Sequence, residues 1–114
     1  MALRDLDVAQ ALDRMDGDRQ LLLELVDVFL GDLPRQMQAI RAAIATRDAA
    51  ALVGPAHDIT GSAGNLSALA LQELAERMVR AGRSGDLASA ERLLPEIDQR
   101  ARALAQGVTQ WVTV

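Results

Sequence analysis

The residue best suited to chemistry in this 114-residue chain is its one histidine, His57. The chain has no cysteine, which excludes disulfide bonds, thiolate metal sites and thiol catalysis. No metal site is expected at His57, because there is no second histidine and no Glu-x-x-His spacing. Serine hydrolysis is not expected either, since Ser62 points to another side of the helix predicted below. The remaining chemistry is that of a nucleophilic imidazole, whose unprotonated ring nitrogen can attack a phosphoryl group.

The apolar residues around His57 recur at helical spacing. At about 100° per residue they cluster within about 40° of one direction, and His57 points roughly 140° away, so the imidazole is predicted to face solvent. The apolar stripe consists of Leu52, Ala56, Ile59, Ala63 and Leu66. The face of His57 also carries Val53, Gly54, Thr60, Gly61 and Gly64. A glycine inside a helix costs about 1 kcal/mol relative to alanine. Clearing side chains from the ring, so that a bulky partner can approach, explains these glycines better than accident does.

The whole sequence is typical of helices. It is rich in Ala, Leu, Glu, Gln and Arg, and its apolar positions recur at three and four residues. A short amphipathic segment with Leu3, Leu6, Val8 and Leu12 comes first, and Asp18 is predicted to cap a long helix. The apolar stripe of that helix is Leu22, Val26, Phe29, Leu33, Met37, Ile40 and Ile44. Pro34 lies within it and predicts two coaxial helices or one kinked helix, broken near 31–34.

The second half of the chain predicts three further helices. A polar break at 46–48 precedes the helix that carries His57, and the next helix spans about 67–81. A loop at 82–86 follows, with Asp86 as the cap of the last helix, and Pro95 is expected to kink that helix or loosen its first turns. The seam of this last helix is Ala90, Leu94, Ile97, Ala101, Leu104, Val108 and Trp111. The fold class is all-α: one domain, 1–114, forming an antiparallel four-helix bundle with a short extra N-terminal helix.

The composition of the chain argues against several classes of function. There are 12 Lys+Arg against 16 Asp+Glu, the net charge is −4 and aromatic residues are 2%. Without a basic patch or stacking aromatic side chains, nucleic-acid binding is not expected. The sequence has no apolar run long enough for a membrane span, and its first residues do not form a signal peptide. A cytoplasmic protein without membrane contact is therefore expected.

The segment around His57 resembles the signature of histidine-containing phosphotransfer (HPt) domains, Ala-His-x-Leu-Lys-Gly-Ser-Ala-x-x-Leu-Gly. The matching positions are Ala56, His57, Gly61, Ser62, Ala63 and Leu66, with Ile59 in place of the usual leucine. Residues 25–41 and 68–78 also resemble this family. Two positions depart from the signature: Thr60 stands where most members have a lysine, and Ser67 stands where a glycine usually follows the leucine.

The resemblance implies a relay step in two-component signalling. His57 would accept a phosphoryl group from the aspartate of a response-regulator receiver domain and pass it to another receiver, with a histidine kinase or hybrid histidine kinase in the same pathway. The receiver would supply Mg²⁺, so no cofactor of the chain's own is expected. Val53, Gly61 and Gly64 would lie in the contact with the receiver, next to Thr60 at the position of the usual lysine. The protein would be a monomeric phosphocarrier rather than a free-standing enzyme.

Two other hypotheses stay open. The first is a non-catalytic helical adaptor that binds a receiver or kinase without relaying phosphate, which the absence of the lysine at Thr60 favours. The second is a kinase-substrate domain of the chemotaxis type, which needs a kinase core for which 114 residues leave no room unless the chain is a fragment. Arg77, Arg80 and Arg83 on the next helix are read first as a solvated helix end, and a role in receiver docking is the alternative.

Overall fold

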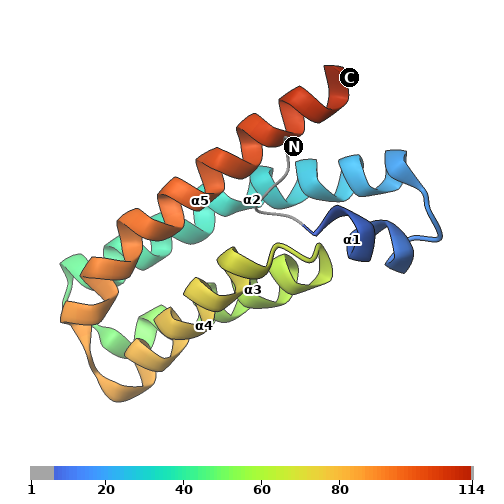
Figure 1. Ribbon diagram of the computed structural model, residues 1–114. Coiled ribbons are helices and arrows are strands. Elements are labelled where there is room, and N and C mark those ends of the chain that lie inside the picture. The colour runs from blue at the N-terminus through green and yellow to red at the C-terminus, as the bar shows by residue number, and fades with distance from the viewer. Residues whose placement is uncertain (1–6, 114) are drawn as a thin grey trace.

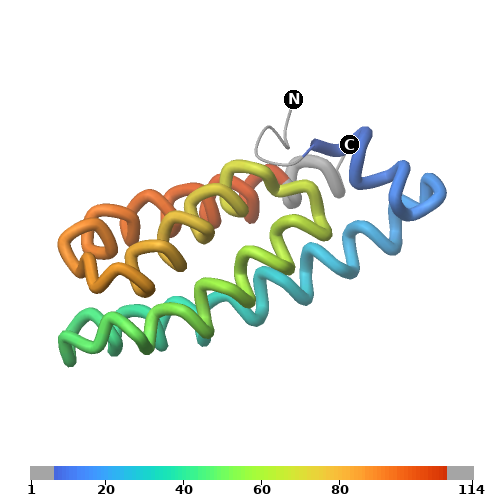
Figure 2. Tube along the Cα trace, turned by 90° about the horizontal axis from the view of Figure 1, so that it is seen from below, coloured from blue at the N-terminus to red at the C-terminus, as the bar shows by residue number. Residues whose placement is uncertain are grey.

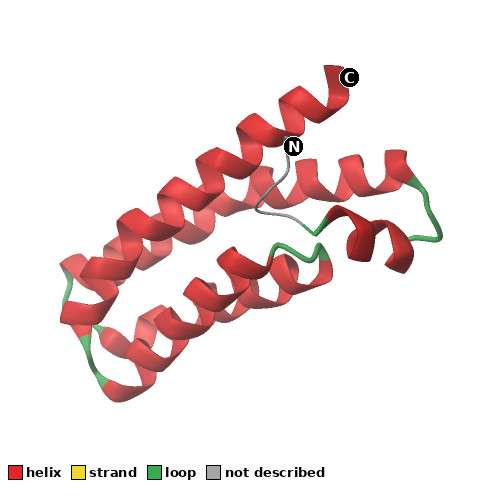
Figure 3. Ribbon diagram, in the orientation of Figure 1, coloured by secondary structure: helices red, strands yellow, loops and turns green. Residues whose placement is uncertain are grey.

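The computed structural model describes residues 7–113 and the side chains of residues 7–107. The α-helices are α1 (Val8–Arg14), α2 (Arg19–Ala45), α3 (Val53–Asn65), α4 (Leu69–Ser84) and α5 (Leu87–Thr113), and a 3-10 helix, η1 (Ala49–Leu52), leads into α3. Helices α2 to α5 run alternately in opposite directions along the bundle, and α1 lies at one end (Figure 1). Short loops join the helices, and residues 7–113 contain no strand (Figure 3). The predicted all-α, antiparallel four-helix bundle is confirmed.

Helix α1 agrees with the predicted N-terminal helix as far as it is described. Val8 and Leu12 are half-buried and pack against the core. The other two predicted apolar residues, Leu3 and Leu6, lie outside the described residues. The turn that follows ends at Asp18, whose carboxylate accepts from the Leu21 amide at 2.9 Å and caps α2 as predicted.

Of the two alternatives predicted at Pro34, the two coaxial helices are wrong, because α2 is one uninterrupted helix from Arg19 to Ala45. Pro34 is exposed, whereas its neighbour Leu33 is buried. Proline lacks the amide that would pair with the carbonyl of Leu30. Since the proline lies on the outer face of the bundle, water can satisfy that carbonyl while the buried stripe on the other face holds the helix together.

The predicted loop at 82–86 is also wrong in its first half, because α4 continues to Ser84. Gly85 ends the helix in the left-handed conformation, with φ of 74°. Asp86 then caps α5 as predicted, and its carboxylate accepts from the amide of Ser89 at 3.0 Å. The hydroxyl and the amide of Ser89 both hold the pKa of the Asp86 carboxyl below its usual range.

Gly82 is a packing glycine rather than a loop glycine. A Cβ at this position would lie 2.9 Å from Val53 Cγ2, 3.0 Å from the Ala49 carbonyl oxygen and 3.1 Å from Leu52 Cβ. These distances are too short for a methyl group, and a backbone atom is among the neighbours. The absence of a side chain at Gly82 therefore lets α4 approach η1 and the start of α3 closely.

Helix α5 closes the core with a seam close to the predicted one. Ala90, Ile97 and Leu104 are buried, whereas Leu94 is half-buried and its neighbour Leu93 is buried instead. The remaining predicted seam residues are Ala101, which is half-buried, and Val108 and Trp111, whose side chains lie outside those described. The helix is uninterrupted at Pro95, which is exposed like Pro34.

We predict that Gly82→Ala destabilises the bundle although alanine is the better helix former. Overpacking against Val53 and Ala49 costs about 1–3 kcal/mol, which exceeds the gain of about 1 kcal/mol in helix propensity. Gly31→Ala in α2 is the matched control, because nothing lies within 4 Å of a Cβ there. Chemical denaturation should show Gly82→Ala below the wild type and Gly31→Ala at or above it. Equal stabilisation by both substitutions would contradict the packing role of Gly82.

Candidate functional site

Helix α3 presents His57 on its outer face. Helix α3 itself lies between α2 and α4 when the bundle is seen from below (Figure 2). Ala56, Ile59 and Ala63 point into the core and are 0% exposed. His57 and Asp58 are exposed on the opposite side. The predicted solvent-facing orientation of the imidazole is therefore confirmed.

Two glycines leave the space around His57 open. A Cβ built on Gly54 or on Gly61 would meet nothing within 4 Å, and both residues are exposed. They lie about one helical turn before and after His57. A partner surface can therefore approach the ring without meeting side chains from these positions of α3.

Gly64 lies in a different setting from the one predicted for it. It is half-buried, and a Cβ there would lie 2.8 Å from Nε2 of Gln72 on α4. Its carbonyl oxygen accepts from Nη1 of Arg14 at 3.0 Å. The space that Gly64 leaves is thus taken by Gln72 from within the molecule, whereas the space at Gly61 is open. Gln72 was not recognised from the sequence, because its position beside Gly64 depends on how α3 and α4 align.

Val53 and Thr60 form the side of the His57 face that borders α4. Val53 is half-buried and lies against Gly82. Thr60 is half-buried too, and its hydroxyl donates to the carbonyl of Ala56 at 3.0 Å. The threonine hydroxyl therefore satisfies a backbone carbonyl of its own helix and adds no positive charge to the site.

Ser67 occupies a position that favours glycine. Its φ is 58°, in the left-handed region, where a side chain costs roughly 1–2 kcal/mol. The residue is fully buried, and its hydroxyl bonds to Oε1 of Gln10 at 2.6 Å. The amide of Asp7 also donates to the Ser67 carbonyl at 2.9 Å. These bonds to the N-terminal segment offset the strain and attach α1 to the turn between α3 and α4.

The described residues contain neither a group of side chains that could hold a metal ion nor a helix that could span a membrane. Within residues 7–113, no group of His, Cys, Asp and Glu side chains is arranged to hold a metal ion. None of the described helices combines the length and hydrophobicity that a membrane span requires. The fold and the site together define a helical bundle with one exposed histidine on α3, the helix that lies between α2 and α4.

Comparisons with known proteins agree with this class. The sequence matches the Hpt domain family over residues 24–107. The fold is similar to that of histidine-containing phosphotransfer protein B from Pseudomonas aeruginosa PAO1, with a TM-score of 0.84, 22% identity and coverage of 94% of this chain and 93% of that chain. It is also similar to the HPT domain of an Hpt sensor hybrid histidine kinase from Shewanella, with a TM-score of 0.80, 20% identity and coverage of 97% and 96%. A search of curated proteins found no significant match.

The family match covers more than half of the chain, so the chain belongs to the Hpt domain family. Its role is histidine phosphotransfer in a two-component phosphorelay. The resemblance that was drawn from the residues around His57 is confirmed.

Proposed function

We propose that His57 is the phospho-acceptor of this chain. The observation that carries the proposal is that the single histidine is exposed on the outer face of α3, with open space at Gly54 and Gly61. Its neighbours Ala56 and Ile59 are fully buried, so the ring is held by a helix that cannot rotate without exposing apolar surface. The imidazole is therefore kept on the outer face of the bundle, where a phosphoryl group can approach it.

The donor and the acceptor are the aspartates of response-regulator receiver domains. The unprotonated ring nitrogen of His57 bonds to phosphorus as the bond between phosphorus and the aspartyl oxygen breaks. The aspartate leaves as a carboxylate, and the proton on the other ring nitrogen can pass to water. The reverse sequence delivers the phosphoryl group to a second receiver. Catalysis of this kind rests on positioning and charge neutralisation rather than on covalent chemistry by other groups.

The receiver supplies Mg²⁺ in this proposal, and the chain contributes no cofactor. Receiver docking places Val53, Gly61 and Gly64 in or beside the contact, with Gly61 at its open centre and Gly64 already packed by Gln72. A histidine kinase or hybrid histidine kinase stands elsewhere in the same relay. We further propose that the protein is a monomer, because the face of His57 has to stay accessible to successive partners. We also propose that it acts in the cytoplasm.

Helix α2 also exposes apolar side chains that a docking partner can contact. Leu21, Leu25 and Val28 follow one another at helical spacing and are 38%, 40% and 60% exposed. Contacts between proteins usually combine an apolar centre with a polar rim. This stripe on α2 is therefore an exposed apolar surface that a receiver can use in addition to the His57 face.

A receiver-binding adaptor that does not relay phosphate is the second candidate. The observation that favours it is Thr60, whose hydroxyl bonds to the Ala56 carbonyl and offers no charge where most family members have a lysine. Such an adaptor would keep the docking surface and sequester its partner.

We predict that a phosphorylated receiver domain from the same genome transfers phosphate to this protein, and that His57→Gln abolishes the transfer. The phosphate should be acid-labile and alkali-stable, as expected for phosphohistidine. Thermal unfolding of His57→Gln should match the wild type within about 0.5 kcal/mol, because the side chain is exposed. Equal phosphorylation of both proteins would refute His57 as the acceptor, and binding without phosphorylation would favour the adaptor.

A bulky residue at Gly61 should block docking without weakening the bundle. Gly61→Leu places a side chain in the open space beside His57 and also improves helix propensity by about 0.5–1 kcal/mol. Transfer from the phosphorylated receiver should fall at least about tenfold, which corresponds to roughly 1.4 kcal/mol. Ala88→Leu, at an exposed position of α5, is the control and should transfer normally. Undiminished transfer in Gly61→Leu would show that this face is not the contact.

A further inference from the structure

A phosphoryl group on His57 creates a local charge problem. It adds close to two negative charges to a chain whose net charge is already −4. The only other charged side chain on α3 is the exposed carboxylate of Asp58, which is negative as well. The whole chain contains no lysine, so every candidate cation is an arginine. A neutralising charge supplied by this chain itself must therefore come from an arginine outside α3.

The alignment of α4 beside α3 is fixed by contacts at both ends. Gly82 packs against Val53, and Gln72 lies against Gly64. The two helices are antiparallel (Figure 1), so these pairs place His57 opposite the middle of α4, close to the level of Val79. Gln72 and Val79 are seven residues apart and share the flank of α4 that faces α3. Arg83 follows Val79 by one helical turn and lies on the same flank.

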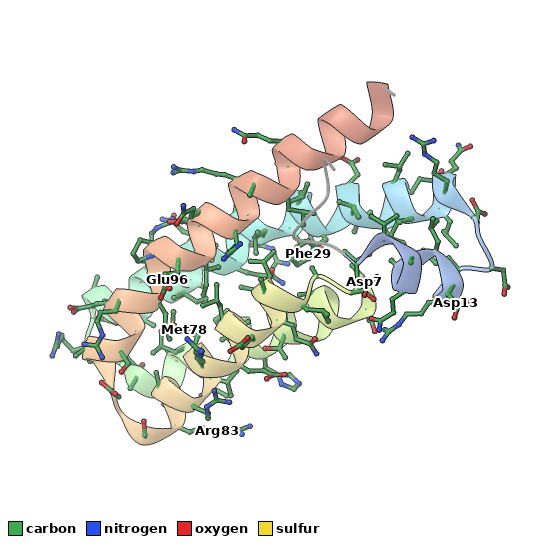
Figure 4. The ribbon with its side chains drawn as sticks, in the orientation of Figure 1. Asp7, Asp13, Phe29, Met78, Arg83 and Glu96 are labelled. Atoms are coloured by element: carbon green, nitrogen blue, oxygen red, sulfur yellow. The ribbon has the colours of Figure 1, made fainter. Side chains whose placement is uncertain are left out.

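The three arginines of α4 divide between its two flanks. Arg77 forms an ion pair with Glu73 at 2.8 Å, and together with Arg80 it lines a cleft of about 560 Å³ between α4 and α5. Arg83 does not line that cleft. Its side chain is exposed and makes no hydrogen bond or ion pair with any residue in 7–113. Figure 4 shows Arg83 at the edge of α4 that lies away from Glu96 of α5. Arg83 is thus a cation without an ion-pair partner among residues 7–113, on the flank of α4 that faces α3.

We propose that Arg83 is the cation that binds the phosphoryl group on His57. This inference rests on the proposed function. The guanidinium donates hydrogen bonds to phosphoryl oxygens both in phosphohistidine and while the nitrogen–phosphorus bond forms or breaks. Arginine suits this role because its planar fork can bind two oxygens at once and stays charged at all working pH values. The charge that Thr60 does not supply from within α3 comes from the adjacent helix.

The test uses potassium phosphoramidate, a small donor that needs no docking surface. The His57 ring nitrogen bonds to phosphorus as the bond to nitrogen in phosphoramidate breaks and ammonia leaves. We expect Arg83→Gln to slow phosphorylation of His57 about tenfold, the loss typical for one charge-assisted hydrogen bond. Arg77→Gln is the matched control: it removes the same charge from the same helix on the α5 flank, and it should stay within about twofold of the wild type. Added salt should reduce the difference between Arg83→Gln and the wild type, because the interaction is exposed.

Restoring a charge within α3 should rescue the variant. Thr60 is one turn from His57 on the same helix, so Thr60→Lys in the Arg83→Gln background should return the rate toward that of the wild type. A wild-type rate in Arg83→Gln would overturn the assignment of Arg83, and so would an equal loss in Arg77→Gln, which would indicate a general effect of net charge. Failure of the proposed function is a separate outcome, since a wild-type chain that takes no phosphate on His57 would refute both.

Discussion

Helix α3 has to bury one face and keep the opposite face bare, and the rest of the bundle is arranged around this requirement. Its 13 residues include three glycines and a proline, so it is a weak helix by intrinsic propensity. The stabilisation comes from burial, since a side chain such as Ile59 contributes about 1.5–3 kcal/mol when it is removed from water. The neighbouring helices thus stabilise α3, which exposes the His57 ring between Gly54 and Gly61.

The close contact between α3 and α4 gives this arrangement its electrostatic consequence. Gly82 lets α4 approach the start of α3, and Gln72 fills the space at Gly64 near its other end. With both ends fixed, the flank of α4 that faces α3 runs beside His57, and Arg83 on this flank is the cation that we propose for the phosphoryl group. The proposed receiver contact, the proposed positive charge and the packing of the site therefore all depend on α3 and α4. The bond between Ser67 and Gln10 completes the structure by tying α1 to the end of α3.

The sequence predicted the features that depend on periodicity and local capping. The apolar stripe of α3, the exposure of His57 and the caps at Asp18 and Asp86 follow from short-range rules, and the structure agrees with them. The failures involve tertiary packing. Pro34 was expected to divide or kink α2, and its exposed position leaves the helix continuous. Gly82 was assigned to a loop, although its contacts are with Val53 and Ala49. The partner of Gly64 could not be predicted, because no local rule sets the alignment of α3 with α4.

The most direct test of the account is a nuclear magnetic resonance experiment on uniformly ¹⁵N-labelled protein. The chain has one imidazole, so the ring region contains the signals of only two nitrogens. After mixing with a phosphorylated receiver, the account predicts that one of these nitrogens becomes coupled to ³¹P, while the backbone amide of buried Ile97 keeps its shift because the bundle does not rearrange. Phosphate bound to the chain without coupling to either ring nitrogen would contradict the account.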